Sequence, residues 1–226
     1  MLFNIIMFII LITKMENPQL NRGAFIVIEG IDRSGKTTQS KLLVDKLCSH
    51  GISSTRICFP DRSTAIGKVI HEYLVGNIEL TSKAIHLLFS ANRWEVMKSI
   101  EEFLLKGITV VCDRYAYSGV AYTVATGNAS LEWCKHPDKG LIKPDILIYF
   151  YSDPAALATR AEYGNEKYDN IDFQRKVKEQ FSIIIEPPYF SYDALLSKEE
   201  LSKIILYDVL NNIKNTPERI NHNLWM

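Results

Sequence analysis

Gly30-Ile-Asp-Arg-Ser-Gly-Lys-Thr37 is the stretch that decides the fold, because it matches the pattern G-x-x-x-x-G-K-[ST] of a phosphate-binding loop. Its glycines allow a tight turn whose backbone N–H groups point inward, toward an anion. In such a loop the lysine lies along the β- and γ-phosphates of a nucleotide, and the threonine hydroxyl can hold Mg²⁺. The sequence therefore predicts a nucleotide site whose phosphate-binding residues are Gly30, Ser34, Gly35, Lys36, Thr37 and Thr38.

The segments on either side of this loop have the character that a phosphate site requires. Ala24-Phe-Ile-Val-Ile-Glu29 is an apolar run of strand length. Residues 38–47 have helical spacing, with Leu42, Leu43 and Leu47 on one face. A strand, a glycine loop and a helix N-terminus together surround an anion with amide dipoles. A glycine turn without a ligand is the alternative, and the flanking elements argue against it.

The rest of the chain alternates apolar strand-like runs with helical patterns. Strands are expected at 53–59, 108–113 and 145–151, and a weaker one near 189–192. Helices are expected at 63–73, 81–105 and 195–214, and over 154–186 with a polar interruption at 163–170. Continuous apolar strands that alternate with helices indicate an α/β fold, here one domain with a parallel five-stranded sheet and helices on both faces.

Details of two helices can be predicted as well. On the helix at 63–73, Ile66, Val69 and Ile70 are expected to face inward. The helix at 81–105 has Thr81 as its expected N-cap, and Gly107 is expected just beyond its C-terminus.

The composition is that of an ordinary globular protein. The chain has 226 residues, of which 47% are hydrophobic, and its 26 basic residues balance 26 acidic ones, so nothing global favours a nucleic acid or a membrane surface as partner. Four cysteines are spaced too widely for a C-x-x-C pair, which suits a reducing compartment and predicts a cytoplasmic protein. Residues 1–12 are almost wholly apolar but too short to span a bilayer. We expect residues 1–21 to be an extension outside the fold and 22–226 to be the domain.

Acidic and basic residues at two loop positions suggest chemistry. Asp113 ends a buried strand, where it can join the shell of Mg²⁺ directly or through water, and Arg114 beside it can reach a phosphate. A strand-end salt bridge is the alternative.

Asp32 inside the phosphate loop would repel phosphate unless it faces a sugar hydroxyl or a cation, whereas Arg33 adds a planar donor beside the γ-phosphate. This pair favours transfer between two substrates, although exposed charges without a role remain the alternative.

Two aromatic residues are each followed by an arginine at short spacing. Phe89 and Arg93 share a helix face, so the ring can stack on a base while the guanidinium binds its edge. Phe59 and Arg62 form a similar pair across a proline turn. A phenylalanine at helical spacing is more often a core residue, and this alternative stays open. The two histidines of this region, at 71 and 86, are expected to be structural.

Several long runs of the sequence resemble the thymidylate kinase family, in the type found in eukaryotes and large DNA viruses. They are Glu29-Gly-Ile-Asp-Arg-Ser-Gly-Lys-Thr-Thr-Gln39, Phe59-Pro-Asp-Arg-Ser-Thr64, Leu87-Leu-Phe-Ser-Ala-Asn-Arg-Trp-Glu95 and Asp113-Arg-Tyr-Ala-Tyr-Ser-Gly-Val-Ala-Tyr122. Lys143-Pro-Asp145 and the segment around Tyr163-Gly-Asn-Glu-Lys-Tyr168 extend the resemblance, which covers roughly Arg22 to Lys176.

The resemblance implies that ATP passes its γ-phosphoryl group to dTMP with Mg²⁺, giving dTDP and ADP. It implies that Phe89 stacks on thymine, that Arg93 binds the edge of the ring, and that Arg62 and Arg114 hold the acceptor phosphate. Asp32 would engage the sugar 3′-hydroxyl, Tyr122 would lie against the sugar, and Arg33 would be the catalytic arginine. The full implied sets are Arg33, Lys36, Asp113 and Arg114 for catalysis, Thr37 and Asp113 for the metal, and Asp32, Phe59, Arg62, Phe89, Arg93, Arg114, Ser118, Gly119, Tyr122 and Tyr168 for the acceptor.

The family also implies a mobile lid near 160–170 and a homodimer that uses the helix at 81–105 as a contact surface. The rival readings are a related kinase with dUMP or a nucleoside as acceptor, and a nucleotide-dependent switch. Two arginines for an acceptor phosphate argue against a nucleoside. A guanine switch would need Asn-Lys-x-Asp, and the nearest string, Asn165-Glu-Lys-Tyr-Asp169, has the wrong spacing.

Overall fold

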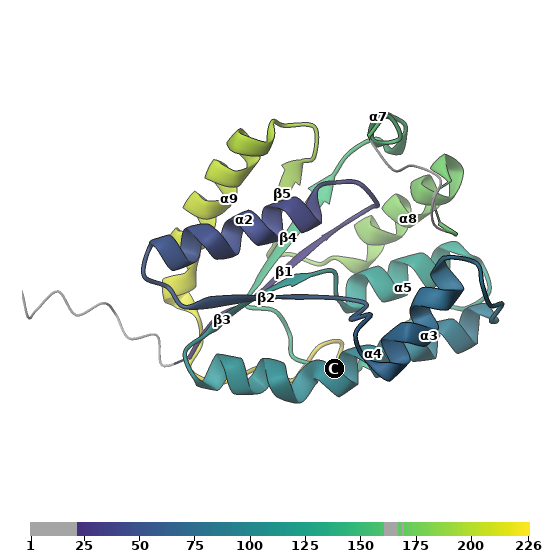
Figure 1. Cartoon of the computed structure of the whole chain (residues 1–226), viewed down its shortest axis with the longest axis horizontal. Helices are drawn as coiled ribbons and strands as arrows, with labels where there is room; N and C mark the ends of the chain where they lie inside the picture. Colours follow the sequence, from purple (N-terminus) through teal and green to yellow (C-terminus); the bar gives the residue numbers. More distant parts are fainter. Residues whose placement is uncertain (1–21, 161–166, 169) are drawn as a thin grey trace, which may run out of the picture.

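A parallel sheet forms the centre of the molecule, as the alternating pattern predicts (Figure 1). The computed structural model describes residues 22–160, 167–168 and 170–226. In this part of the chain the sheet has five strands, in the order β2-β3-β1-β4-β5, and every neighbouring pair is parallel. The strands are β1 (Phe25–Gly30), β2 (Ser54–Cys58), β3 (Thr109–Asp113), β4 (Ile146–Tyr151) and β5 (Phe190–Asp193).

Helices cover both faces of this sheet. Helix α2 (Lys36–Ser49) packs beside α9 (Lys198–Asn212) on one face, and α4 (Ser82–Leu105), α5 (Ala116–Ala125) and α8 (Ile171–Ile184) cover the other (Figure 1). Helix α3 (Ala65–Leu74) packs on α4. The short elements are α6 (Leu131–Lys135), η1 (His136–Asp138), α7 (Pro154–Leu157) and η2 (Ile213–Asn215). None of the helices in the described residues is both long and apolar enough to cross a membrane.

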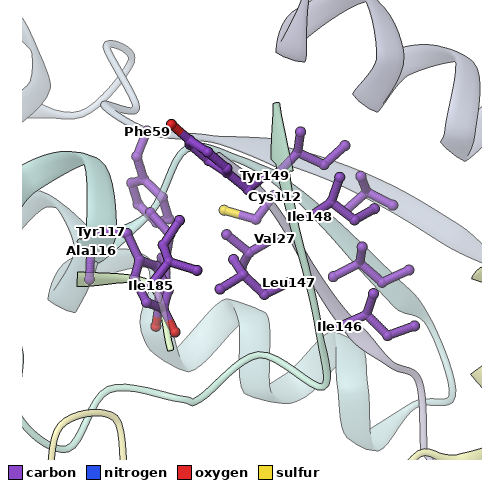
Figure 2. Close-up of a cluster of buried hydrophobic side chains, with 14 of the residues drawn as sticks. Val27, Phe59, Cys112, Ala116, Tyr117, Ile146, Leu147, Ile148, Tyr149 and Ile185 are labelled. Atoms are coloured by element: carbon purple, nitrogen blue, oxygen red, sulfur yellow. The ribbon is translucent and has the colours of Figure 1, made fainter. Parts of the chain in front are cut away.

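The core lies where the three central strands meet the helices. Val27 of β1 is the register partner of Cys112 on β3 and of Leu147 on β4, and all three are buried. Figure 2 shows these side chains in one cluster with Tyr117 of α5 and Ile185. Strands buried on both faces cannot alternate between polar and apolar residues, which explains their continuous apolar sequences.

The structure confirms most of the predicted elements and corrects some details. Thr81 caps α4, since its hydroxyl accepts from the N–H of Ala84 at 3.3 Å, and Gly107 follows the helix with a φ of 77°. The inward orientation predicted for Val69 is wrong, because its side chain is 40% exposed. The buried face of α3 runs through positions 67, 70, 73 and 74 and excludes position 69.

The region after Asp113 and the region after β4 differ from the expectation. Helix α5 was not predicted, because nine of its ten residues are buried and the sequence shows no amphipathic period. The helical pattern at 154–186 resolves into α7 and α8, and the helix predicted at 195–214 begins at Lys198, where Ser197 and Glu200 form a capping box. The predicted interruption and lid fall largely on residues 161–166 and 169, which lie outside the described part.

Candidate active site

The phosphate loop lies between β1 and α2, as its sequence context predicts. Gly30 has a φ of 149°, and a Cβ there would lie 2.7 Å from the carbonyl oxygen of Phe150, so only glycine fits. The N-cap of α2 is Gly35, which has no side chain to accept from the first N–H groups of the helix, so these stay available to the loop. The loop therefore offers the amide donors that bind phosphate.

Lys36 is the buried cation of this loop. Its Nζ donates to the carbonyl of Ile31 at 2.5 Å and to the hydroxyl of Ser34 at 3.2 Å. Burial and the neighbouring charge of Arg114 lower the pKa of Lys36 to about 7, although three nearby carboxylates oppose this. A phosphate beside the amine would favour its charged form. The loop is thus arranged for an anion.

Thr37 and Asp113 meet at the end of the sheet, as expected for a metal site. The hydroxyl of Thr37, in the first turn of α2, donates to Oδ2 of Asp113 at 2.7 Å. Among the described residues there is no cluster of three or more His, Cys, Asp or Glu that could hold a metal. A hydroxyl and a single carboxylate suit Mg²⁺, which keeps several waters and takes other oxygens from substrate phosphates. The donor set therefore fits this ion.

Asp32 faces a cation, which is one of the two alternatives that the sequence leaves open. Its carboxylate pairs with Arg114, and it accepts from Nε2 of Gln174 at 2.6 Å. Burial would raise the pKa of Asp32, but the charges of Arg114 and Lys36 outweigh it and hold that pKa below its ordinary value. Arg114 also donates to the carbonyl of Gly30 at 3.3 Å, so this pair links the phosphate loop to the neighbouring cavity.

That cavity lies beside the phosphate loop, since Asp32 forms part of its wall. All ten residues expected in the acceptor site line it: Asp32, Phe59, Arg62, Phe89, Arg93, Arg114, Ser118, Gly119, Tyr122 and Tyr168. Pro60, Leu74 and Tyr115 also line it and were not predicted. Its mixture of aromatic and charged groups is typical of a small-molecule site.

The aromatic and the arginine predicted on one helix face both reach this cavity from α4. Arg93 is only 2% exposed and is held by Asp138, with Nη2 2.6 Å from Oδ2 and Nε 3.1 Å from Oδ1. Its guanidinium also lies against α5, since a Cβ on Gly119 would be 2.9 Å from both Nη1 and Nη2. A buried, doubly held arginine beside an aromatic ring can read the edge of a flat heterocycle.

Glu29 joins the end of β1 to the start of α5. This buried carboxylate accepts from the N–H groups of Tyr115 and Ser118 at 2.8 and 3.0 Å and from the Ser118 hydroxyl at 2.5 Å. Burial raises its pKa although these hydrogen bonds oppose the shift. The contact fixes Ser118 and Gly119 at the cavity wall.

Tyrosines close the cavity on the side of α8. The Tyr168 ring stacks on Phe173 with centroids 5.1 Å apart and meets Tyr122 edge-on at 5.6 Å. Its hydroxyl lies 3.3 Å from that of Tyr73. The guanidinium of Arg114 lies 5.4 Å from the centre of the Tyr122 ring.

The remaining predicted residues lie at the phosphate loop, and some supporting residues were missed. Thr37 and Thr38 are exposed at the start of α2, and Arg33 is half-buried outside the cavity wall. The carbonyl of Arg33 accepts from Arg160 at 2.7 Å. His86 is structural as expected, with its ring nitrogens 2.8 Å from the Thr123 hydroxyl and from the Cys134 carbonyl. Four supporting residues were missed: Arg56, Asp138, Arg160 and Gln174. The sequence gives only Asp138 a weak signal, as an acid after proline in a polar stretch.

Comparisons with known proteins all point to one family. The family model described as thymidylate kinase matches residues 28–205. The chain is 45% identical over 205 residues to thymidylate kinase of Plasmodium falciparum (isolate 3D7), covering 90% of this chain and 97% of the relative. It is 42% identical over 207 residues to that of Homo sapiens, covering 90% and 98%. The solved thymidylate kinase of Candida albicans superposes with a TM-score of 0.83 at 36% identity, covering 90% of this chain and 99% of the other.

Proposed function

The chain belongs to the thymidylate kinase family, and from this premise we propose how its residues transfer the γ-phosphoryl group of ATP to dTMP. The reaction gives dTDP and ADP and makes the protein a nucleoside monophosphate kinase. One observation carries the assignment of roles. The ten residues expected for the acceptor line a single cavity that the Asp32–Arg114 pair joins to the phosphate loop.

The acceptor is held at three points in this proposal. Phe89 stacks on the thymine while Arg93, fixed by Asp138, binds its edge. Asp32 takes the 3′-hydroxyl, and Tyr122 lies against the sugar. Arg62 and Arg114 neutralise the acceptor phosphate, which places its oxygen toward the phosphate loop. Holding a reactant in this way supplies much of the rate in phosphoryl transfer.

The donor side supplies positive charge. The amides at the start of α2 and the amine of Lys36 bind the β- and γ-phosphates of ATP. Arg33 stabilises charge on the transferred group, a role worth about 10³-fold or more in related systems. Thr37 and Asp113 would hold Mg²⁺, which would neutralise part of the phosphate charge. Asp113 would hold this ion directly or through water.

An acceptor panel tests this function. ADP release is followed with ATP and, in turn, dTMP, dUMP, dCMP and thymidine. We expect dTMP to give the highest kcat/KM and thymidine, which lacks the phosphate for Arg62 and Arg114, to give the lowest. If none of the monophosphates leads to ADP release and the protein binds GTP tightly, the result would instead support a switch protein.

We further propose a cytoplasmic homodimer. Leu87, Trp94 and Leu105 of α4 are 47%, 43% and 64% exposed, and Leu87 and Trp94 lie seven residues apart on one side of the helix. A contact with a second copy would bury them. The four cysteines, all within the described residues, are free thiols, which suits the reducing cytoplasm.

A further inference from the structure

Arg56 of strand β2 makes contacts that the proposed mechanism does not use. Its Nη2 lies 2.6 Å from Oδ2 of Asp113, and its Nε donates to the hydroxyl of Ser40 at 2.7 Å. Asp113 ends β3, and Ser40 belongs to the helix that follows the phosphate loop. The side chain is 23% exposed, so water reaches one side of it. It ties together two strands and the phosphate-binding helix.

These contacts place the two oxygens of Asp113 in different situations. Oδ2 accepts from both Thr37 and Arg56, at 2.7 and 2.6 Å. Oδ1 accepts no hydrogen bond from any residue in the described part of the chain. A carboxylate oxygen with free lone pairs at a sheet end is the group that a hard cation or its water can use.

We propose that Arg56 is a positioning residue for the Mg²⁺ site. By occupying Oδ2 it fixes the carboxylate of Asp113 against Thr37 and leaves Oδ1 available to the ion or its water. This inference rests on the proposed function, because it needs Asp113 to belong to the Mg²⁺ shell. Residues that orient a metal ligand from behind typically change metal affinity by about 10–100-fold when they are removed.

Two effects of Arg56 on Mg²⁺ oppose each other. Its positive charge repels a second cation, whereas the fixed orientation of Asp113 favours binding. Water on the exposed side of the guanidinium screens its charge. Water does not weaken the orienting effect in the same way, because Nη2 and Nε of Arg56 bind two different elements, β3 and α2. We therefore expect removal of Arg56 to weaken Mg²⁺ binding.

The experiment titrates Mg²⁺ into protein and ATP without acceptor, so that binding is measured by calorimetry in the absence of turnover. It compares the unaltered protein with Arg56→Met, Arg56→Lys and Arg175→Met. Arg175 is a matched control, since it pairs with Asp172 at 2.6 Å on the exposed face of α8. Affinity for ATP without Mg²⁺, the KM for dTMP, kcat and the melting temperature complete the set.

For Arg56→Met we expect the Mg²⁺ concentration at half-saturation to rise about tenfold and kcat to fall about tenfold. ATP affinity without Mg²⁺ and the KM for dTMP should stay unchanged. Arg56→Lys keeps the charge but offers one nitrogen in place of the two that contact Asp113 and Ser40, so an intermediate loss is expected. Arg175→Met should match the unaltered protein.

Equal or tighter Mg²⁺ binding by Arg56→Met, with only a lower melting temperature, would overturn the proposal and leave Arg56 as a structural ion pair. If Arg56→Met does not fold, Arg56→Lys decides, and Mg²⁺ binding equal to that of the unaltered protein again refutes the inference. Failure of the proposed function would be seen in the unaltered protein, which would then neither phosphorylate dTMP nor bind ATP more tightly with Mg²⁺.

Discussion

Two of the residues proposed to grip the acceptor are themselves held from outside the cavity. Asp138 lies behind Arg93, and Gln174 lies behind Asp32. Neither support lines the cavity wall. Orientation at the site therefore depends on groups that lie behind the cavity wall, and a wall residue can be tested separately from its support.

Phe89→Ala tests the stacking contact. Loss of an aromatic platform under a base costs about 1–3 kcal/mol in comparable systems. We expect the KM for dTMP to rise about 5- to 150-fold, since each 1.4 kcal/mol is a factor of ten. The KM for ATP should not change, because Phe89 belongs to α4 and is not one of the residues proposed to bind ATP. Steady-state kinetics with each nucleotide varied in turn measures both values, and an unchanged KM for dTMP would refute the stacking role.

The lowered pKa of Lys36 leads us to expect that the protein takes up a proton when ATP binds. The pKa of the Lys36 amine is lowered to about 7, chiefly by burial, so before ATP binds we expect the amine to be mostly neutral at pH 8. Bound phosphates favour the ammonium form and raise this pKa again. At pH 8 we expect uptake approaching one proton for each ATP, and uptake should vanish at about pH 6, where the amine is already charged.

Calorimetry of ATP binding in two buffers of different ionisation enthalpy measures this uptake. Lys41→Met is the control, because Lys41 is exposed on the same helix and should leave the uptake unchanged. Equal binding enthalpies in the two buffers at pH 8 would show that Lys36 is already charged in the free protein.

At the scale of elements, the meeting of α4 and α5 shapes the cavity. Gly119→Ala adds a Cβ that would lie 2.9 Å from Nη1 and Nη2 of Arg93. Arg93 cannot yield easily, since Asp138 holds its guanidinium at two points. We expect the KM for dTMP to rise at least about tenfold, equivalent to 1.4 kcal/mol, with little change in ATP affinity.

The melting temperature separates a local effect of this substitution from a general one. Alanine is favoured over glycine within a helix by about 1 kcal/mol, so α5 itself should not be weakened. A KM for dTMP like that of the unaltered protein would mean that Arg93 does not need its observed position.

The helices and strands also show which parts of the fold and the site can be predicted from the sequence. The phosphate loop and its flanking strand and helix follow from local spacing, and so do the five strands. Helix α5 could not be predicted, because a helix buried on almost every side carries no amphipathic period. Gln174 and Asp138 could not be predicted as supports either. They lie 142 and 45 residues from Asp32 and Arg93, and only the fold brings them together.

At the scale of the whole molecule, the proposed dimer makes a direct prediction. The chain has a mass of 25.8 kDa, and we expect light scattering after size exclusion to give twice that value. Leu87→Glu should shift the mass to that of the monomer, because it places a charge at the proposed contact. Leu195→Glu is the control, since Leu195 is 52% exposed and lies outside α4. A single-chain mass for the unaltered protein would contradict the dimer.

The described fold begins with a firmly anchored residue. Arg22 is 3% exposed, pairs with Asp145 at 2.6 Å and donates to the carbonyl of Pro217 at 2.8 Å. This is consistent with the expectation that the domain begins near residue 22. That expectation stays a prediction, because residues 1–21 lie outside the described part.

The carboxylate of Glu29 has a mechanical consequence. It sits one residue before the phosphate loop, yet it holds the first turn of α5, which forms the acceptor wall. The hydrogen bonds of Glu29 therefore link the phosphate loop directly to the wall of the acceptor cavity, and we expect the distance between the two nucleotide sites to stay constant. Any movement that closes the reaction off from water must then come from segments outside this contact.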